Sequence, residues 1–360
     1  MKPNIFDIAT KELHQDAFIT WLLQYSDKQY EIVDPLLNKC GREFITKLIQ
    51  TKIPDFEEEI NTVVADRQWD NIDVRAKINN KYLIIIEDKT VSSFHSNQLE
   101  RYQKSATIWC VENDYLEPIC IYLKTGNDSK RNLKKVMDKG YTVFQRQDFL
   151  AILTKYQKCS NDIFIDFYNR LKRLEKINNQ FEQKEIGDWD GNDWQGFFQF
   201  LEREIHLVNW HYVNNPAGGF WNAIVNWKQW GNYPAYVQIE EGKLCFKVST
   251  HPEDIEFSSE RKRSAVRNDL HQLIMKQAEK ENLVEIETPR KFGNGNYMTV
   301  AIVKRHNWLG KKESTIDPKD VVNNIKKYRK FLDRVIQTSP KEYEKTETTG
   351  EIAQGHQVIH

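Results

Sequence analysis

The first half of the chain switches repeatedly between helical and strand-like patterns of apolar positions. Apolar side chains recur every three or four residues over 5–24 and 31–52, which predicts helices. Runs of β-branched and aromatic residues predict strands. In chain order, the pattern then predicts three strands, centred on 60–64, around Asp73 and over 83–86, with a polar turn over 66–70 between the first two. After them it predicts a helix over 93–107, a strand over 118–124, a helix over 129–138, a strand over 141–144 and a long helix over 161–185. This order is typical of an α/β fold, with a mixed sheet between helices.

The second half has a different pattern and composition. Seven of the ten tryptophans lie in it. It shows, in order, a helix over 191–204, strand-like runs over 220–227, 233–240 and 243–250, a long helix over 258–282, short strands over 283–287 and 297–304, and a helix over 317–337. We therefore predict a first domain over 1–185 and an α+β domain over 186–337. Residues 338–360 lack apolar periodicity and are expected to be a disordered tail.

Composition narrows the class of protein. With 52 basic and 52 acidic residues, the net charge is zero, which argues against a protein that coats polyanions but allows a locally basic cleft. No apolar run approaches the ~20 residues of a membrane span, and the start of the chain lacks the apolar core of a signal peptide. Five cysteines without a C-x-x-C pair indicate reduced thiols rather than a zinc site. We expect a cytoplasmic protein with no membrane association.

The chemistry of the chain is concentrated over 71–102. The apolar run over 83–86 leads directly into Glu87, Asp88 and Lys89. Side chains alternate along a strand, so Glu87 and Lys89 share one face and Asp88 points to the other. Charged groups at the edge of an apolar core need partners or a metal ion.

The hairpin before this strand leaves two registers open. A three-residue loop over 79–81 sets Asp73 directly opposite Glu87, whereas a two-residue loop over 79–80 sets it opposite Ile86. Two carboxylates and a lysine that converge suit a hard divalent cation such as Mg²⁺. Such an ion holds a phosphodiester and lowers the pKa of a bound water, and the lysine can orient that water or stabilise charge on the phosphate.

This stretch resembles the core of the PD-(D/E)XK nuclease superfamily. Asp73 matches the metal-binding aspartate, and Glu87-Asp88-Lys89 matches the E-x-K element that follows an apolar strand. Gln98 and Tyr102 match the Q-x-x-x-Y helix of the RecB-like branches.

The segment before these motifs is also similar to the family. Over 4–23 it looks like the N-terminal helix of the superfamily, in which a glutamate often completes the site. Glu12 is the matching residue, with Asp16 as a substitute on the same helical face. The sequence departs from the pattern at Ile72, where the family name has proline. The resemblance covers roughly residues 3–175.

The resemblance implies a restriction-endonuclease-like mixed sheet flanked by helices, followed here by the α+β domain. It implies that Mg²⁺ or Mn²⁺ is bound by Asp73, Glu87, Glu12 and the main-chain carbonyl of Asp88. Lys89 would position the attacking water. Gln98 and Tyr102 would hold the substrate or brace the site.

By the same resemblance, the function is metal-dependent hydrolysis of nucleic acid, with a DNA endonuclease in bacterial or phage defence or in DNA repair favoured. A homodimer or a defence-system partner protein is expected as a further partner. The alternative is a catalytically silent module that binds nucleic acid or protein on the same fold. If the acids merely end strands, Asp73 and Glu87 diverge and Lys89 lies in solvent.

Two other groups of residues have open interpretations. His95 is interpreted as a surface residue rather than a ligand. A basic cluster begins the long helix of the second half and either contacts phosphate or forms a solvated face; it consists of Arg261, Lys262, Arg263 and Arg267.

Overall fold

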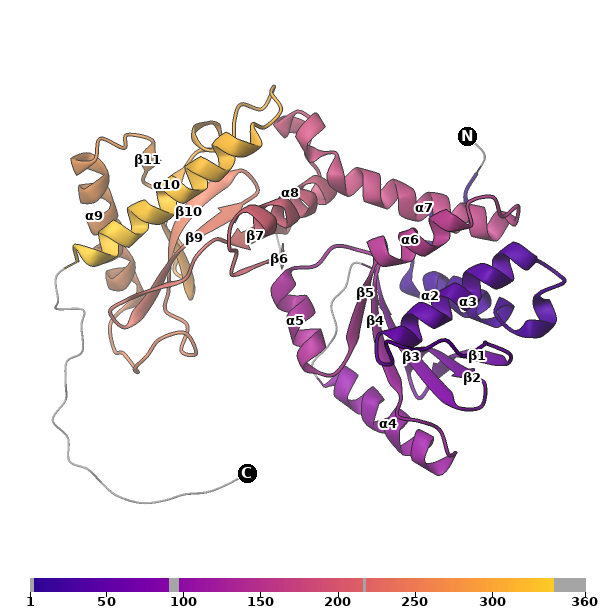
Figure 1. Ribbon diagram of the computed structural model, residues 1–360. Coiled ribbons are helices and arrows are strands. Elements are labelled where there is room, and N and C mark those ends of the chain that lie inside the picture. The colour runs from indigo at the N-terminus through magenta and orange to yellow at the C-terminus, as the bar shows by residue number, and fades with distance from the viewer. Residues whose placement is uncertain (1–2, 91–96, 216–217, 340–360) are drawn as a thin grey trace, which may run out of the picture. The chain divides into compact units, whose positions relative to one another are not determined.

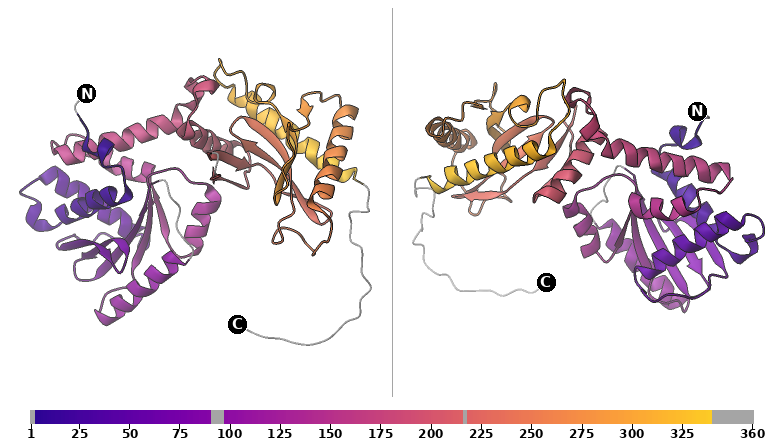
Figure 2. Two further views of the ribbon diagram at one scale, coloured as in Figure 1. Left: turned by 180° about the vertical axis from the view of Figure 1, so that it is seen from behind. Right: turned by 45° about the horizontal axis from the view of Figure 1, so that its top comes forward.

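The computed structural model describes residues 3–90, 97–215 and 218–339 (Figures 1 and 2). The contacts divide the chain into two compact units. Unit 1 contains Met1–Lys184 and Trp189–Phe200, and unit 2 contains Glu185–Asp188 and Leu201–His360. The position of His95, the first residues of the helix predicted over 93–107 and the predicted tail from residue 340 onward lie outside the described residues.

Unit 1 is built on a five-stranded sheet with the order β1-β2-β3-β4-β5. The first three strands form an antiparallel meander, and β4 and β5 continue the sheet in parallel. The strands are β1 (Val63–Trp69), β2 (Ile72–Ile78), β3 (Tyr82–Lys89), β4 (Ile119–Lys124) and β5 (Thr142–Gln145). The predicted mixed sheet is confirmed.

Helices cover both faces of this sheet (Figure 1). One core contains Ile84 and Ile86 of β3 together with apolar residues of α1, α2, α3, α6 and α7. The other contains Leu83 and Ile85 of β3 together with residues of α4 and α5. The helices are α1 (Ile5–Ile8), α2 (Glu12–Tyr25), α3 (Pro35–Gln50), α4 (Gln98–Glu112), α5 (Lys130–Asp138), α6 (Arg146–Lys155) and α7 (Asp162–Asn179). Because β3 is buried on both faces, its apolar run alternates between two separate cores.

The turn predicted over 66–70 is wrong. Strand β1 continues to Trp69, with an irregularity at Gln68, and the chain reverses at Asp70 and Asn71; Gln68, Asp70 and Asn71 all have positive φ. Arg75 of β2 explains the difference, because its guanidinium pairs with Asp66 at 2.5 Å and lies 4.4 Å from the centroid of the Trp69 ring. This cross-strand contact keeps a polar segment extended.

Unit 2 is built on an antiparallel sheet with the order β11-β12-β10-β9-β7-β6, and β8 also pairs with β9. Helices α9 and α10 contact strands of this sheet. Its strands are β6 (Asn209–Val213), β7 (Phe220–Ile224), β8 (Lys228–Trp230), β9 (Tyr233–Glu240), β10 (Lys243–Ser249), β11 (Ile286–Glu287) and β12 (Tyr297–Val303). Its long helices are α9 (Arg263–Lys280) and α10 (Pro318–Gln337). The predicted α+β module is therefore present.

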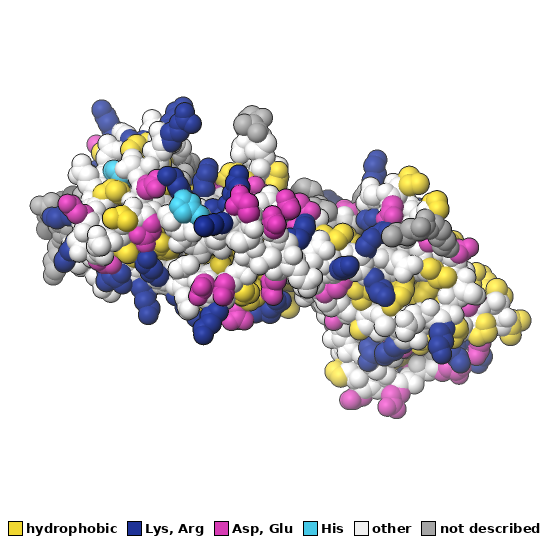
Figure 3. Space-filling view, turned by 90° about the horizontal axis from the view of Figure 1, so that it is seen from above, with side chains coloured by type: hydrophobic (Ala, Val, Ile, Leu, Met, Phe, Trp, Pro, Cys, Tyr) yellow, Lys and Arg dark blue, Asp and Glu magenta, His cyan; other side chains and the backbone are white. Residues whose placement is uncertain are grey.

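Helix α8 (Gly191–Glu204) begins in unit 1 and ends in unit 2. None of the described helices has the length and apolar composition needed to cross a membrane. On the face shown in Figure 3, basic and acidic side chains are interspersed, in keeping with the equal numbers of the two types in the sequence.

Candidate active site

The end of β3 places three charged residues on the two faces of the sheet. By alternation, Glu87 and Lys89 lie on the side of Leu83 and Ile85, which is the side covered by α4 and α5. Asp88 lies on the opposite side. All three are buried, with exposed fractions of 1 %, 0 % and 7 % for Glu87, Asp88 and Lys89. Charged side chains this deeply buried need specific partners.

The β2–β3 hairpin brings Asp73 to the same place. The loop over 79–81 is the three-residue one, since Ile78 pairs with Tyr82 and the ladder continues to Val74 opposite Ile86. The next opposed positions are Asp73 and Glu87. Asp73 Oδ2 also accepts a hydrogen bond from the backbone N–H of Asp88 at 2.9 Å.

Lys89 lies among the carboxylates. Its Nζ is 2.5 Å from Glu87 Oε1, 3.6 Å from Asp73 Oδ2 and 3.9 Å from Glu12 Oε2. It also donates a hydrogen bond to the main-chain carbonyl of Asp88 at 3.1 Å. The structure thus brings the predicted acids and the predicted lysine to one point.

Glu12 reaches this point from the first turn of α2. Its Oε1 accepts hydrogen bonds from the backbone N–H of Thr90 at 3.0 Å and from Thr90 Oγ1 at 3.2 Å. These bonds tie the start of α2 to the residue that follows β3. Asp16, one turn later on α2, interacts instead with Asp88, which lies on the other side of β3.

Gln98 and Tyr102 lie on one side of α4 and contact the site from within the core. Gln98 Nε2 donates hydrogen bonds to Glu87 Oε1 at 2.8 Å and to the Tyr102 hydroxyl at 3.1 Å. Tyr102 is buried in the apolar core between α4 and the sheet. In this geometry the pair orients Glu87.

Burial and mutual repulsion shift the protonation of Glu87. Burial, followed by repulsion from Asp73, raises the pKa of Glu87 to about 8, despite the adjacent Lys89 ammonium. Burial lowers the pKa of Lys89, but attraction to Glu87, Asp73 and Glu12 outweighs burial and leaves it above the ordinary value. Lys89 therefore stays protonated and acts as a fixed positive charge.

The opposite side of β3 holds a second group of buried polar residues. Gln15 Nε2 donates to Asp88 Oδ1 at 2.5 Å, and Thr125 Oγ1 donates to Gln15 Oε1 at 2.9 Å. Burial, then repulsion from Asp73, raises the pKa of Asp16 to about 7. Burial and repulsion from Asp16 raise the pKa of Asp88 well above its ordinary range. This pair of carboxyls therefore retains protons that exposed acids lose.

Comparison with protein families gives one match, to a family of the PD-(D/E)XK nuclease superfamily, over residues 3–183. The chain belongs to the PD-(D/E)XK nuclease superfamily. The matched region contains the whole five-stranded sheet of unit 1 and every residue predicted for the site. No curated protein and no solved structure matches the chain.

Nucleases of this superfamily generally use divalent metal ions, and the donors present here fit such an ion. Asp73, Glu87, Glu12 and the Asp88 carbonyl offer only oxygen atoms, which hard cations prefer. Glu87 Oε2 is buried without a hydrogen-bond partner. In the described part of the chain, no three acidic, His or Cys side chains already form a metal-binding group. The reason is local, because the Lys89 ammonium lies where these carboxylates approach one another.

Sequence reasoning missed several residues that lie in this candidate site. Gln15 and Thr90 hold Asp88 and Glu12. On β4, Tyr122 pairs in register with Glu87, and Lys124 pairs in register with Lys89. Burial lowers the pKa of Lys124, which lies 3.9 Å from Asp128. The strand over 118–124 was predicted, but only the register shows that its Tyr and Lys lie beside the motif.

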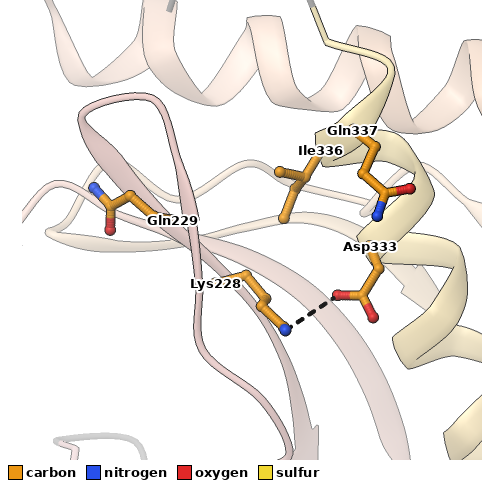
Figure 4. A pocket seen from close by; sticks show the side chains of 5 residues that line it. All are labelled: Lys228, Gln229, Asp333, Ile336 and Gln337. Carbon is orange, nitrogen blue, oxygen red and sulfur yellow. Dashed lines mark ion pairs between the residues drawn. The ribbon is translucent and has the colours of Figure 1, made fainter. Parts of the chain in front are cut away.

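A surface pocket in unit 2 is separate from this site. It has a volume of about 230 Å³ and is lined by Lys228, Gln229, Asp333, Ile336 and Gln337 (Figure 4). Lys228 and Asp333 point toward one another and form an ion pair at 3.8 Å. The pocket offers neither a pair of carboxylates nor a nucleophile, so we assign it no part in hydrolysis.

Proposed function

We propose that this PD-(D/E)XK protein is a metal-dependent DNA endonuclease centred on Asp73, Glu87 and Lys89. The observation that carries the proposal is the position of the Lys89 ammonium within 4 Å of three carboxylates at the end of one buried strand. Acids that merely end strands would diverge and leave the lysine in solvent. Such a costly arrangement of buried charge is typical of functional sites.

Each residue has a role that follows from its contacts. Asp73, Glu87, Glu12 and the Asp88 carbonyl would hold Mg²⁺ or Mn²⁺. The bound ion would activate the phosphate as a Lewis acid and lower the pKa of a water. Lys89 would orient the water that attacks phosphorus and stabilise the charge that grows as one P–O ester bond breaks.

The remaining residues position these groups. Gln98, itself in contact with Tyr102, holds one oxygen of Glu87 and leaves the other for a ligand. Thr90 fixes the carboxylate of Glu12. Fixed donors and acceptors of this kind keep the reacting groups aligned without reorganisation during the reaction. A place in bacterial or phage defence or in DNA repair is proposed from the family resemblance alone.

The test is cleavage of supercoiled plasmid, single-stranded DNA and RNA with Mg²⁺, with Mn²⁺ and with EDTA. We expect plasmid nicking and linearisation with either ion and none with EDTA. Lys89→Met and Asp73→Asn should each lower the rate by about 10²–10³-fold, the usual cost of losing a group that stabilises transition-state charge.

Exposed residues of α5 provide matched controls. Lys134→Met and Asp138→Asn make the same chemical changes in a solvent-exposed i,i+4 pair, and both should retain wild-type rates. Equal cleavage by all five proteins would show that the nuclease centre lies elsewhere. Metal binding measured by calorimetry without any cleavage would favour a silent binding module.

A further inference from the structure

Unit 2 carries a group of exposed cations that the active site does not use. One part is the start of α9, with Arg261, Lys262, Arg263 and Arg267, and the other is the loop before β12, with Arg290 and Lys291. We call these six residues the basic patch. All except Arg267 are exposed, and Arg267 is half-buried.

Arg267 joins the two parts of the basic patch. Its guanidinium carbon lies 4.6 Å from the centroid of the Phe292 ring, and Nη1 donates to the carbonyl of Gly293 at 2.8 Å. His271, one turn later on α9, packs edge-on against the same ring at 5.0 Å. The ring is thus held from α9 by two side chains, which places Arg290 and Lys291 beside the helix.

The charge of the basic patch is mostly uncompensated. Arg261 pairs with Asp269. None of the ion pairs found among the described residues involves the other five cations of the patch. Over residues 260–269 and 290–293, six cations stand against two acids, Glu260 and Asp269, which leaves an excess of four positive charges. The whole chain has no net charge, so this surface is a local concentration of one sign.

We propose that the basic patch binds the phosphodiester backbone of the nucleic acid substrate. The inference rests on the proposed function, which supplies the polyanion. Arginine and lysine side chains on a fixed platform neutralise phosphates and release the counterions bound to them, without reading sequence. Guanidinium groups are suited to phosphate oxygens because they donate two parallel hydrogen bonds.

The loop leaves room for a backbone to approach. A Cβ atom added at Gly293 or at Gly295 would meet no atom within 4 Å. The loop is therefore open at these two glycines, and Arg290 and Lys291 in the same loop are themselves exposed.

The experiment measures binding of labelled duplex DNA to the full chain by fluorescence anisotropy, in EDTA so that metal-dependent cleavage is stopped. The patch variant combines Lys262→Gln, Arg263→Gln, Arg290→Gln and Lys291→Gln, and leaves Arg267 in place to hold the loop. The control variant removes the same number of exposed cations from the far end of α9 and from α10, by Lys276→Gln, Lys280→Gln, Lys326→Gln and Lys330→Gln.

Removing one cation that neutralises a phosphate lowers the slope of log affinity against log salt by about 0.9 on duplex DNA. We expect the affinity of the patch variant at low salt to fall by about ten- to hundredfold and its slope to fall by about 2–4. The control should stay within about twofold of wild type. Equal weakening by both variants, an unchanged patch variant, or wild-type protein that binds anionic lipid vesicles but not DNA would each overturn the inference.

The cleavage assay with Asp73→Asn separates this inference from the proposed function. Patch-dependent DNA binding by a protein that cleaves nothing leaves the basic patch standing and rejects the nuclease. Cleavage that is lost in Asp73→Asn, together with DNA binding that is unchanged in the patch variant, supports the nuclease and rejects the basic patch.

Discussion

The buried acidic side chains on the two sides of β3 are compensated in different ways. On the side of Glu87, three carboxylates from β2, β3 and α2 share the Lys89 ammonium. On the side of Asp88, Gln15 donates to Asp88, and burial raises the pKa values of Asp16 and Asp88, which favours their protonated forms. The first side thus sets a fixed cation against its acids, although burial still raises the pKa of Glu87 to about 8, whereas the second side relies on protons. A metal ion bound at the first side would favour the ionised form of Glu87, and the carboxylates of Asp73 and Glu12 approach the same point.

The most direct test of this difference replaces one carboxyl by an amide on each side of β3. Glu87→Gln removes a carboxyl that a bound metal ion would ionise and use as a ligand, and it should lower DNA cleavage by about 10²–10³-fold. Asp88→Asn keeps the main-chain carbonyl and the contact with Gln15, so its rate should stay within about threefold of wild type. Initial rates of plasmid nicking at saturating Mg²⁺ compare the two. Equal losses would mean that the two sides act as one site.

A second test of the comparison removes the titratable carboxyl of Asp16, on the Asp88 side of β3. Asp16 has its pKa raised in the folded protein, so its ionisation destabilises the fold as pH rises from the unfolded value near 4 to about 7. Asp16→Asn removes that penalty. In EDTA it should raise the free energy of unfolding by about 2 kcal/mol at pH 8 and by little below about pH 4.

Urea unfolding at a series of pH values measures this gain, with the exposed Asp138→Asn as the control that should change stability by no more than about 0.5 kcal/mol. The gain should grow between pH 4 and pH 7 and stay level above. A loss of stability at pH 8 would show that Asp16 is held as a carboxylate, like the acids around Lys89.

The smallest expected effect tests how Glu87 is oriented. Gln98→Ala removes its hydrogen bond while all metal ligands remain. Groups that orient a metal ligand are worth about tenfold or more in metal affinity. The Mg²⁺ concentration needed for half-maximal cleavage should therefore rise about tenfold, with a smaller change in the rate at saturation. Gln103→Ala, on the same helix, is the control, and a change confined to the saturated rate would argue for substrate contact instead.

The parts of this site that follow from local pattern were predictable. The apolar run over 83–86 fixes the strand, and alternation then separates Asp88 from Glu87 and Lys89. The register was not predictable, because both hairpin loops fit the sequence. Positive φ at Asn79 and Asn80 accompanies the three-residue loop. Asparagine tolerates that conformation, but its presence does not fix the loop length.

Contacts between distant segments explain what the sequence did not show. Gln15 and Asp88 are far apart in the chain, and no local signal marks Gln15 as the partner of a buried acid. The extent of β1 depends on Arg75, which belongs to the next strand. Strand β6 pairs at the edge of the second sheet with β7, and its mixed polar and aromatic residues show no clear period. In each case a tertiary partner decides the local structure.

The ammonium of Lys89 also matters for how the protein folds in the absence of a metal ion. A site made only of acids would repel itself in a freshly synthesised apoprotein and would depend on the ion for folding. Here Lys89 supplies the counter-charge, so we expect the protein to fold without the ion. If the proposed nuclease needs a divalent ion, chelation should therefore be reversible and should leave a folded protein that regains hydrolysis when the ion is added, without refolding.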